Sequence, residues 1–204
     1  VPMLSLDNCF SPEELHQWLE KLYRAIIGLD TTAATTKTTP TTPVLLILSE
    51  PKLDGVSLNL HFTKTNEQHY QLTWASTRGD GRQGTDVTAA VLEMDIPTTF
   101  AYKGSTGDTL DVRGELLLPK TVPNARNAAS GLLLRKESNS DLRREFTFYA
   151  YDLCGEAAVV DDIMTGQELR ETLQTMGFAV PYPVASTTLH LSTNQTTDIS
   201  ELLN

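Results

Sequence analysis

The positions of apolar and polar residues along the chain predict several β-strands. An unbroken apolar run at 44–48 and an alternating run at 56–62 both have the pattern of a strand. The segment between them, residues 50–55, is therefore expected to be held from both sides, as in the turn of a hairpin. A third alternating run, at 68–77, is expected to direct three large side chains to one face: Tyr70, Leu72 and Trp74.

Two more strands are expected in the second half of the chain. Residues 146–152 carry aromatic side chains on both faces, which indicates a central strand. In the run 110–119, a period of two separates an apolar face from a charged face. A carboxylate beside an arginine suits a hydroxylated, phosphorylated ligand; the alternative is a solvated face with a cross-paired arginine and glutamate. The apolar set is Leu110, Val112, Leu116 and Leu118, and the charged set is Asp111, Arg113 and Glu115.

The first helix is expected to begin at Ser11. Pro12 suits the first helical position, and Glu14 is placed to complete a capping box. The segment 30–43 is mostly threonine, which carries no core and favours extended chain, so a surface loop is expected there; a glycosylated stalk is the alternative. The helix itself is expected to have roughly four turns. Its apolar face consists of Leu15, Leu19, Leu22 and Ile26.

Further helices are expected in the second half of the chain. Thr165 and Glu168 form a second capping box, and the helix that follows is expected to stop at Gly177, a typical C-terminal cap. A short helix is expected within 86–94. Another is expected to start at Asn124 as its cap.

The composition restricts the function. The 204 residues are 40% hydrophobic, which is ordinary for a globular core, and carry a formal net charge of −10. A surface with this much negative charge repels phosphate backbones unless its basic residues are clustered. Binding of nucleic acid by this segment alone is therefore not predicted. The two cysteines, Cys9 and Cys154, exclude a disulfide framework and a zinc site built from C-x-x-C pairs, and indicate a reducing compartment. The sequence shows no apolar run long enough for a bilayer and no signal-peptide pattern.

Lys52 is the candidate nucleophile. A lysine between two strands has little freedom, and an amine must be aimed and deprotonated before it attacks. Asp54 is placed to orient the amine, and Gly55 allows a ligand to approach the backbone closely. The alternative is an ordinary turn with a solvated lysine and aspartate. The loop 77–86, with three glycines beside aspartate and arginine, suits phosphate binding, and again the alternative is a simple turn.

A series of short motifs follows the order found in one protein family. They are PMLSLDN at 2–8, EPKLDG at 50–55, TRGDG at 77–81, GTDVT at 84–88, VRGE at 112–115, ARNAASG at 125–131, TFYAY at 147–151 and GFAVP at 177–181. In this order they resemble the adenylation (nucleotidyltransferase) domain of bacterial-type, NAD-dependent DNA ligases. The resemblance covers nearly the whole chain apart from the Thr-rich insert. It implies an α+β fold, an ATP-grasp-like nucleotidyltransferase core of antiparallel sheets flanked by helices.

The resemblance assigns chemistry to several residues. Lys52 would attack the α-phosphate of NAD, carry AMP as a phosphoramidate and release nicotinamide mononucleotide, with Asp54 completing the motif. Arg78 would contact phosphate or ribose. Arg126 would reach the phosphates or the nicked strand. NAD as AMP donor and Mg²⁺ are the implied cofactors, and no side chain is assigned to a metal.

Other residues would bind the adenosine half of NAD. Glu50, with the backbone of Ser5 and Leu6, would read the adenine edge. Glu115 would accept hydrogen bonds from the ribose hydroxyls, and Tyr151 would stack on the adenine. A positioned amine, an Arg/Glu strand face and an aromatic strand together are consistent with a nucleotide pocket.

The sequence departs from the family pattern in several places. Relative to that pattern, it lacks the N-terminal helical subdomain that holds the nicotinamide mononucleotide half of NAD and the D-G-V-V-I-K strand with the later lysine motif. The OB, zinc-finger, helix-hairpin-helix and BRCT domains are also absent. Leu134 occupies the place of a second arginine, and Arg135 follows one position late. Residues 1–204 are therefore expected to be a partial adenylation domain with a Thr-rich insert at 30–43, inactive or very weak by itself.

The resemblance also implies partners and a compartment. A ligase of this type joins nicked double-stranded DNA in replication and repair, here through domains outside the sequence, as a monomer without a membrane partner. The cytoplasm is expected for a bacterial-type enzyme, and an organelle or the nucleus for a eukaryotic source. The alternative function is a catalytically incompetent nucleotide-binding remnant of such a ligase. An RNA ligase or capping-type nucleotidyltransferase fits less well, because the motifs at 2–8 and 126–131 favour the NAD-dependent ligases.

Overall fold

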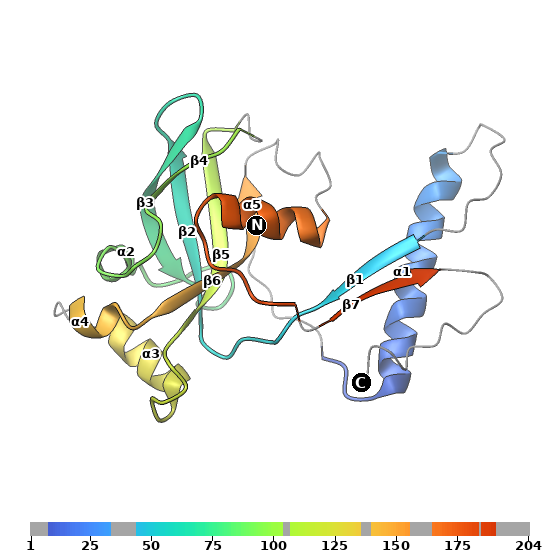
Figure 1. Cartoon of the computed structure of the whole chain (residues 1–204), viewed down its shortest axis with the longest axis horizontal. Helices are drawn as coiled ribbons and strands as arrows, with labels where there is room; N and C mark the ends of the chain where they lie inside the picture. The colour runs from blue at the N-terminus through green and yellow to red at the C-terminus, as the bar shows by residue number, and fades with distance from the viewer. Residues whose placement is uncertain are drawn as a thin grey trace. The chain divides into compact units, whose positions relative to one another are not determined.

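The computed structural model describes residues 8–33, 44–103, 107–135, 140–155, 165–183 and 185–190. The chain divides into two compact units, with boundaries between Glu50 and Pro51 and between Tyr182 and Pro183 (Figure 1). Most of the predicted site residues belong to the larger unit: Lys52, Asp54, Arg78, Glu115, Arg126 and Tyr151.

An antiparallel sheet of five strands forms the framework of the larger unit (Figure 1). The strand order is β4-β3-β2-β5-β6, and every neighbouring pair is antiparallel. The predicted α+β class, with antiparallel sheets and accompanying helices, is confirmed. The strands are β2 (Val56–Lys64), β3 (His69–Thr77), β4 (Thr99–Ala101), β5 (Thr109–Leu117) and β6 (Thr147–Gly155).

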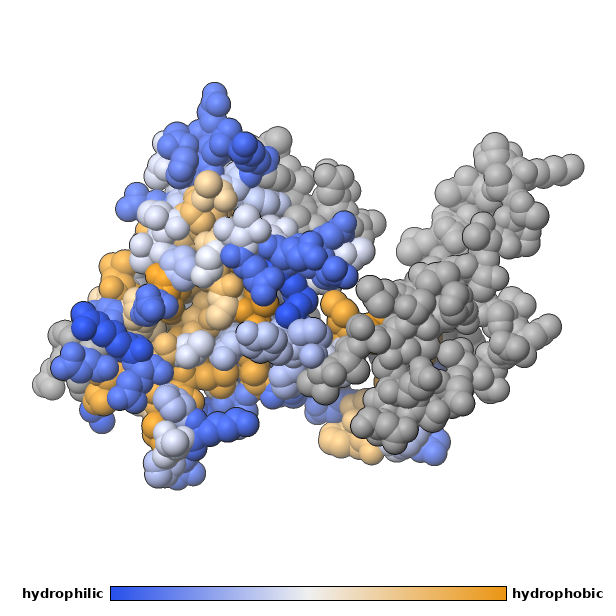
Figure 2. Space-filling model, in the orientation of Figure 1, coloured by the Kyte–Doolittle hydropathy of each residue, from blue (hydrophilic) through white to orange (hydrophobic). Residues whose placement is uncertain are grey.

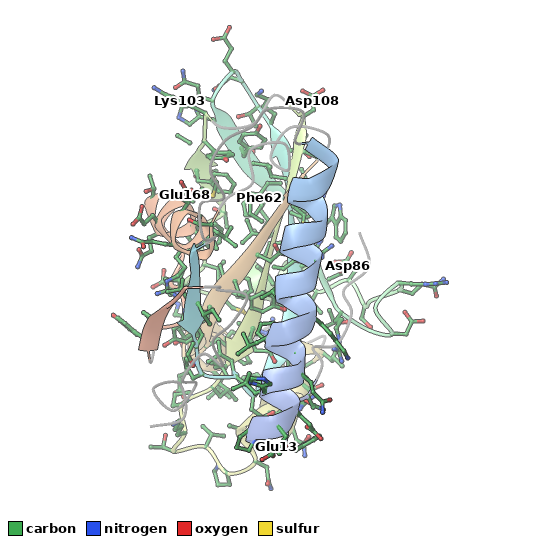
Figure 3. The ribbon with its side chains drawn as sticks, turned by 90° about the vertical axis from the view of Figure 1, so that its right-hand side faces the viewer. Glu13, Phe62, Asp86, Lys103, Asp108 and Glu168 are labelled. Atoms are coloured by element: carbon green, nitrogen blue, oxygen red, sulfur yellow. The ribbon has the colours of Figure 1, made fainter. Side chains whose placement is uncertain are left out.

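One face of this sheet packs against helices and holds the core. Leu58, Leu60 and Phe62, alternate residues of β2, are fully buried, as the sequence pattern predicts. The Phe62 ring lies 4.7 Å from that of Phe100 and 6.1 Å from that of Phe178, centroid to centroid, so aromatic contacts join β2 to β4 and to the segment after the last described helix. Figure 3 shows Phe62 among the packed side chains. Buried side chains also come from α2 (Thr88–Val91), α3 (Ala125–Leu133) and α5 (Gly166–Thr175).

The opposite face of the sheet carries polar side chains. Because strand residues alternate, Ser57, Asn59 and His61 of β2 lie on the face away from the core. The turn between β2 and β3, residues 65–68, is exposed, and hydrophilic residues gather at this end of the larger unit in Figure 2. The predicted division of β5 into an apolar and a charged face is confirmed, since its alternate apolar residues are fully buried: Leu110, Val112 and Leu116.

The prediction that Trp74 shares a face with Tyr70 and Leu72 is wrong. The register between β2 and β3 shifts after His61, so Thr73 is an extra residue in the ladder. This β-bulge reverses the alternation along β3. Tyr70 and Leu72 are buried as predicted, whereas Trp74 is 42% exposed and its ring stacks on that of His61 at 4.9 Å.

The prediction that β6 is a central strand is also wrong, because β6 lies at the edge of the sheet beside β5. Its aromatic residues point both ways for a different reason. Phe148 packs into the core, and Tyr149 and Tyr151 lie on the other face. The outer edge of β6 is partly covered by Ala179, whose carbonyl accepts the backbone N–H of Ala150 at 2.8 Å. This hydrogen bond satisfies an edge group that would otherwise require water.

The strands on either side of residues 50–55 are confirmed, but they do not form a hairpin. β1 (Val44–Ser49) pairs with β7 (Ala185–His190) in a separate antiparallel sheet of two strands, within the smaller unit. β2 belongs to the larger sheet. Residues 50–55 therefore connect strands of different sheets.

Helix α1 (Pro12–Ala33) of the smaller unit begins with the predicted cap. The hydroxyl of Ser11 accepts the backbone N–H of Glu14 at 3.2 Å, and the Glu14 carboxylate accepts the backbone N–H of Phe10 at 2.6 Å. The helix is longer than predicted and includes residues 30–33, which were expected in the Thr-rich loop. Residues 34–43 lie outside the described chain. None of the helices described is long and apolar enough to cross a membrane.

The capping box predicted at residue 165 is present in α5. The Thr165 hydroxyl accepts the backbone N–H of Glu168 at 3.2 Å, and the Glu168 carboxylate accepts that of Thr165 at 2.7 Å. Gly177 has φ 93° and follows the helix, as predicted. Asn124 precedes α3 but does not cap it as predicted. It adopts a left-handed conformation with φ 52°, and among the described contacts its side chain makes no capping hydrogen bond.

A buried arginine joins three helices. Arg143 ends α4 (Ser140–Arg143), a helix that the sequence pattern did not predict. Its Nη1 lies 2.9 Å from the carboxylate of Glu93, just after α2, and its Nη2 donates to the carbonyl of Arg135, just after α3, at 2.6 Å. The short helix predicted within 86–94 is confirmed by α2.

Candidate active site

The carboxylate of Glu115 joins β5 to the start of β2. Its Oε1 accepts a hydrogen bond from the backbone N–H of Gly55 at 3.0 Å, and its Oε2 accepts one from the hydroxyl of Ser57 at 2.6 Å. Glu115 and Ser57 are also directly opposite in the ladder. A protein donor engages each carboxylate oxygen. The Glu115 carboxylate is therefore held against the backbone of Gly55, which is three residues after Lys52.

Two glycines allow the strands to approach closely here. A Cβ added at Gly55 would lie 2.3 Å from the carbonyl oxygen of Leu116. A Cβ added at Gly114 would lie 2.4 Å from both the Phe148 ring and the carbonyl oxygen of Tyr149. Larger residues would force β5 away from its neighbours, so these glycines set the spacing of β2, β5 and β6.

Tyr151 is placed by a β-bulge in β6. Arg113 pairs with Asp152, whereas the next residue of β5, Gly114, pairs with Ala150. Tyr151 is therefore an extra residue in the ladder. Its side chain is 39% exposed, which leaves part of the aromatic ring available for contact.

The surroundings of the Tyr151 phenol connect it to Glu115. Burial raises the pKa of Tyr151 above its ordinary value of 10.0. The nearby Ser57 hydroxyl lowers this pKa, and the nearby carboxylates of Glu115 and Asp152 raise it. The phenol therefore stays protonated at neutral pH and remains a hydrogen-bond donor.

A buried arginine lies in the same polar layer. Arg113 is 7% exposed, its Nε donates to Asn59 at 3.4 Å, and its Nη1 lies 3.7 Å from the carboxylate of Asp152. Asn59 in turn donates to Asp111 Oδ1 at 3.0 Å. The same oxygen lies 2.7 Å from Nδ1 of His61. This chain of contacts compensates the buried guanidinium and fixes the polar face across three strands.

The segment 51–54 carries the candidate nucleophile and has no regular secondary structure. The Lys52 side chain is exposed. Asp54 Oδ1 lies 3.0 Å from Nη1 of Arg126, in the first turn of α3. These two side chains are 77% and 61% exposed, so the ion pair contributes less than about 1 kcal/mol to stability. It nevertheless brings Arg126 to the segment that carries Lys52.

The glycine-containing loop begins beside Ser57. The backbone N–H of Arg78 donates to the carbonyl of Ser57 at 3.0 Å. Two glycines of the loop have left-handed φ values of 55° and 92°. The carboxylate of Asp80 accepts the backbone N–H groups of Gln83 and Arg82, at 2.7 and 2.9 Å, and these hydrogen bonds lower the pKa of Asp80. The turn is therefore tight, as the sequence predicts.

The structure brings some of the predicted site residues together but not all of them. Contacts within the larger unit link the Lys52 segment to Glu115 and Arg126, and Ser57 to the backbone of Arg78, while Tyr151 lies near Glu115. Ser5 and Leu6 lie outside the described residues, and Glu50 belongs to the smaller unit. Ser57 was missed, although the alternation of residues 56–62 already assigned it to the polar face.

Comparisons with known proteins agree with the motif order. The family described as NAD-dependent DNA ligase adenylation domain matches residues 1–201. The DNA ligase of Bartonella tribocorum is 34% identical over 196 residues, which cover 88% of this chain and 24% of that protein. The DNA ligase of Xanthobacter autotrophicus is 38% identical over 176 residues, 78% of this chain and 22% of that protein. The chain thus spans about a quarter of the length of these relatives. Because the family match extends over nearly the whole sequence, the chain belongs to the NAD-dependent DNA ligase adenylation domain family.

Proposed function

We propose that this chain is the nucleotidyltransferase core of an NAD-dependent DNA ligase, in which Lys52 takes AMP from NAD during the joining of nicked DNA. The observation that carries the proposal is the double hydrogen bonding of Glu115 by Gly55 and Ser57. These bonds hold the end of the Lys52 segment against the polar face of the sheet. Family membership supports NAD as the AMP donor.

The proposed chemistry begins with the amine of Lys52. Once deprotonated, its nitrogen attacks the α-phosphorus of NAD. A P–N bond forms while the bond from that phosphorus to the bridging oxygen breaks, and nicotinamide mononucleotide leaves with the electron pair. Asp54 orients the amine, and the guanidinium groups of Arg78 and Arg126 supply positive charge for the phosphates.

The proposed roles of Tyr151 and Glu115 are to hold adenosine. The partly exposed Tyr151 ring stacks on the adenine, a contact that contributes about 1–3 kcal/mol. Glu115 has lone pairs left after accepting two hydrogen bonds, so it can also accept ribose hydroxyls. The roles of Glu50, Ser5 and Leu6 at the adenine edge stay predictions.

Mg²⁺ and DNA are further parts of the proposal. Within the described ranges, no group of three or more His, Cys, Asp or Glu side chains could hold a metal ion. Mg²⁺ commonly binds through one or two carboxylates together with substrate phosphates, so we expect it to accompany the phosphates of NAD, and we assign it no step. Action on nicked DNA, a monomeric state and a cytoplasmic location are predictions for the whole ligase.

The test is AMP transfer to Lys52 in a ligase completed with the family segments named above. The completed enzyme is incubated with Mg²⁺ and NAD radiolabelled in its adenylate half, and the labelled peptide is mapped. Lys52→Ala should abolish labelling, whereas Lys120→Ala, which removes another exposed lysine of the same unit, should leave it unchanged. Label that persists after Lys52→Ala would refute the assignment. AMP binding without transfer to any lysine would favour the alternative, a non-catalytic nucleotide-binding remnant.

A further inference from the structure

Trp74 is a large aromatic residue on the polar face of the larger sheet. The β-bulge at Thr73 turns its side chain away from the core, and the residue is 42% exposed. Regular alternation would have directed the indole to the buried face, with Tyr70 and Leu72. The bulge therefore forgoes the contribution that a tryptophan makes to a core, and leaves an aromatic surface accessible instead.

Trp74 belongs to a row of side chains that crosses three strands. His61 of β2 is directly opposite Trp74 of β3 on one side and Asp111 of β5 on the other. The imidazole and indole rings are stacked, with centroids 4.9 Å apart and planes inclined by 22°. Nδ1 of His61 lies 2.7 Å from Oδ1 of Asp111, and the same oxygen accepts the side-chain amide of Asn59 at 3.0 Å. Each side chain in the row is thus held by its neighbour, so the indole is fixed before any ligand arrives.

The contact between His61 and Asp111 determines which polar atom of the imidazole remains for a ligand. An ionised carboxylate only accepts hydrogen bonds, so Nδ1 of His61 carries the proton in this one. Nε2 is then the nitrogen that can bond a ligand, as an acceptor in the neutral ring or as a donor in the protonated ring. The His61 side chain is 21% exposed. An accessible aromatic surface beside one polar atom suits a flat heteroaromatic ring, which stacks and accepts or donates one hydrogen bond.

This row lies on the same face of the sheet as the proposed adenosine site. Along β2, Ser57 is opposite Glu115 and His61 is opposite Asp111. The two positions are four residues apart, which corresponds to about 13 Å along a strand. The face is therefore long enough to bind a second ring beyond the one that stacks on Tyr151.

We propose that the Trp74–His61 pair is a second ring-binding subsite of this face, where a planar heteroaromatic ring of a nucleotide stacks on the indole. The proposal rests on the proposed function, because it extends the same nucleotide-binding face. His61 covers one face of the indole, so the incoming ring stacks on the other. The ring comes either from the nicotinamide half of NAD or from a base of the nicked strand, and both supply the same chemistry. Trp74 and His61 lie outside every motif that carries the family resemblance.

The fluorescence of Trp74 reports binding at this subsite directly. The chain has two tryptophans, so a Trp18→Phe background leaves Trp74 as the only one. The probes are nicotinamide mononucleotide, a short phosphorylated single-stranded oligonucleotide, and ribose phosphate, which has the sugar and the phosphate but no ring. Calorimetry measures the affinity of each probe for Trp74→Leu and Trp74→Tyr. The control is Tyr182→Leu, which removes a residue that is 81% exposed elsewhere in the larger unit.

At least one of the two ring-bearing probes should quench the fluorescence of Trp74, whereas ribose phosphate should not. The probe that quenches identifies the source of the ring. Trp74→Leu should weaken the binding of this probe about tenfold to a hundredfold, because stacking on an aromatic side chain is lost. Trp74→Tyr keeps an aromatic ring and should retain most of the affinity, and Tyr182→Leu should leave it unchanged.

Three results would overturn the subsite. They are the absence of quenching by both ring-bearing probes, equally strong quenching by ribose phosphate, and an unchanged affinity of Trp74→Leu. The quenching result stands by itself if Trp74→Leu does not fold. Tyr151→Ala should leave the quenching intact, and its loss in this variant would assign the probe to the adenosine site and overturn the proposal. The proposed function fails on a different result, the absence of AMP transfer to Lys52 in the completed enzyme, which does not involve Trp74.

Discussion

Replacing Gly114 with alanine should destabilise the larger unit, whereas the same replacement at Gly131 should stabilise it. Gly114 lies in β5, where an added Cβ would be 2.4 Å from the Phe148 ring and from the carbonyl oxygen of Tyr149. Gly131 lies inside α3, and no described atom comes within 4 Å of its added Cβ. The two substitutions are chemically identical, so a loss of stability confined to Gly114→Ala reports the close contact of β5 with β6.

The expected magnitudes follow from these contacts. At both positions, alanine restricts the unfolded chain and favours folding by about 0.4–1 kcal/mol. In α3, helix propensity acts in the same direction, so Gly131→Ala should gain about 0.5–1 kcal/mol. In β5, the Tyr149 carbonyl belongs to the backbone and cannot rotate away, and overpacking of this kind costs about 1–3 kcal/mol. Gly114→Ala should therefore lose about 1–2 kcal/mol in total.

The assay is urea unfolding followed by tryptophan fluorescence. Trp18 lies in α1 of the smaller unit and Trp74 in β3 of the larger unit, so a Trp18→Phe background makes Trp74 the reporter of the unit that carries Gly114. With a slope of about 2 kcal/mol per molar urea, Gly114→Ala should lower the unfolding midpoint by about 0.5–1 M. Gly131→Ala should raise it slightly.

A Gly114→Ala midpoint equal to or above that of the parent would refute the reasoning. It would mean that β5 and β6 can separate at this point without cost. The spacing of Glu115 and Tyr151 would then not depend on glycine. A loss of stability in both variants would instead indicate that the added methyl group acts through some other route.

Three further predictions concern a thiol, a buried ion pair and a surface ion pair. Burial, together with the Asp152 carboxylate, raises the pKa of Cys154 to about 11. Alkylation of Cys154 by iodoacetamide, followed by mass spectrometry, should therefore be slow at pH 8, and its rate should rise about tenfold per pH unit towards pH 11. Asp152→Asn should make the alkylation faster. Glu93→Gln should lower the free energy of unfolding by about 2–3 kcal/mol, because it leaves the buried Arg143 without its carboxylate. In urea unfolding, adding Arg143→Met to this variant should recover part of the loss. If the effects of the two substitutions on the free energy of unfolding simply add, the two side chains are not coupled. Arg126→Ala should change the free energy of unfolding by less than about 1 kcal/mol yet lower the rate of AMP transfer at least about tenfold; an unchanged rate of labelling would show that Arg126 has no role in the chemistry.

Local signals in the sequence were sufficient wherever the decisive interaction is local. The Ser11 cap and the Thr165 capping box each involve residues at most four apart. The cap hydrogen bond at Ser11 and the full box at Thr165 form as predicted, whereas the Glu14 carboxylate accepts the N–H of Phe10 instead of that of Ser11. The alternation in 56–62 and 110–119 likewise fixes which residues of β2 and β5 enter the core. The left-handed Asn124 is an exception, because the same residue type suits both a cap and a turn with positive φ.

Strand partners and bulges could not be predicted, because both depend on distant parts of the chain. The pattern of 44–48 predicts a strand but does not specify its partner, which lies at 185–190 in another sheet. A bulge is equally invisible, since one extra residue, such as Thr73, is defined only against the neighbouring strand. The wrong face of Trp74 follows directly from this.

The motifs identified more of the candidate site than the strand pattern did. They selected Glu115, whose carboxylate accepts the Ser57 hydroxyl, and Tyr151, whose phenol lies near both. They did not select that hydroxyl, because Ser57 lies between motifs and its partner in the ladder is 58 residues away. A residue whose role depends on a cross-strand neighbour is recognised only once the register is known.

The bulge in β6 shows how the sheet serves the core and the site together. If β6 alternated regularly after the buried Ala150, Asp152 would face the core and Leu153 would face the polar side. The extra residue changes the phase, so Tyr151 and Asp152 both remain on the polar face while Leu153 is buried, 7% exposed. A buried charge and an exposed leucine are thereby avoided. The same insertion places a partly exposed aromatic ring beside Ser57, next to the carboxylate of Glu115. The bulge that places Tyr151 is therefore the same one that lets Leu153 enter the core and keeps Asp152 out of it. The position of a residue in the proposed nucleotide site thus depends on how the sheet itself folds.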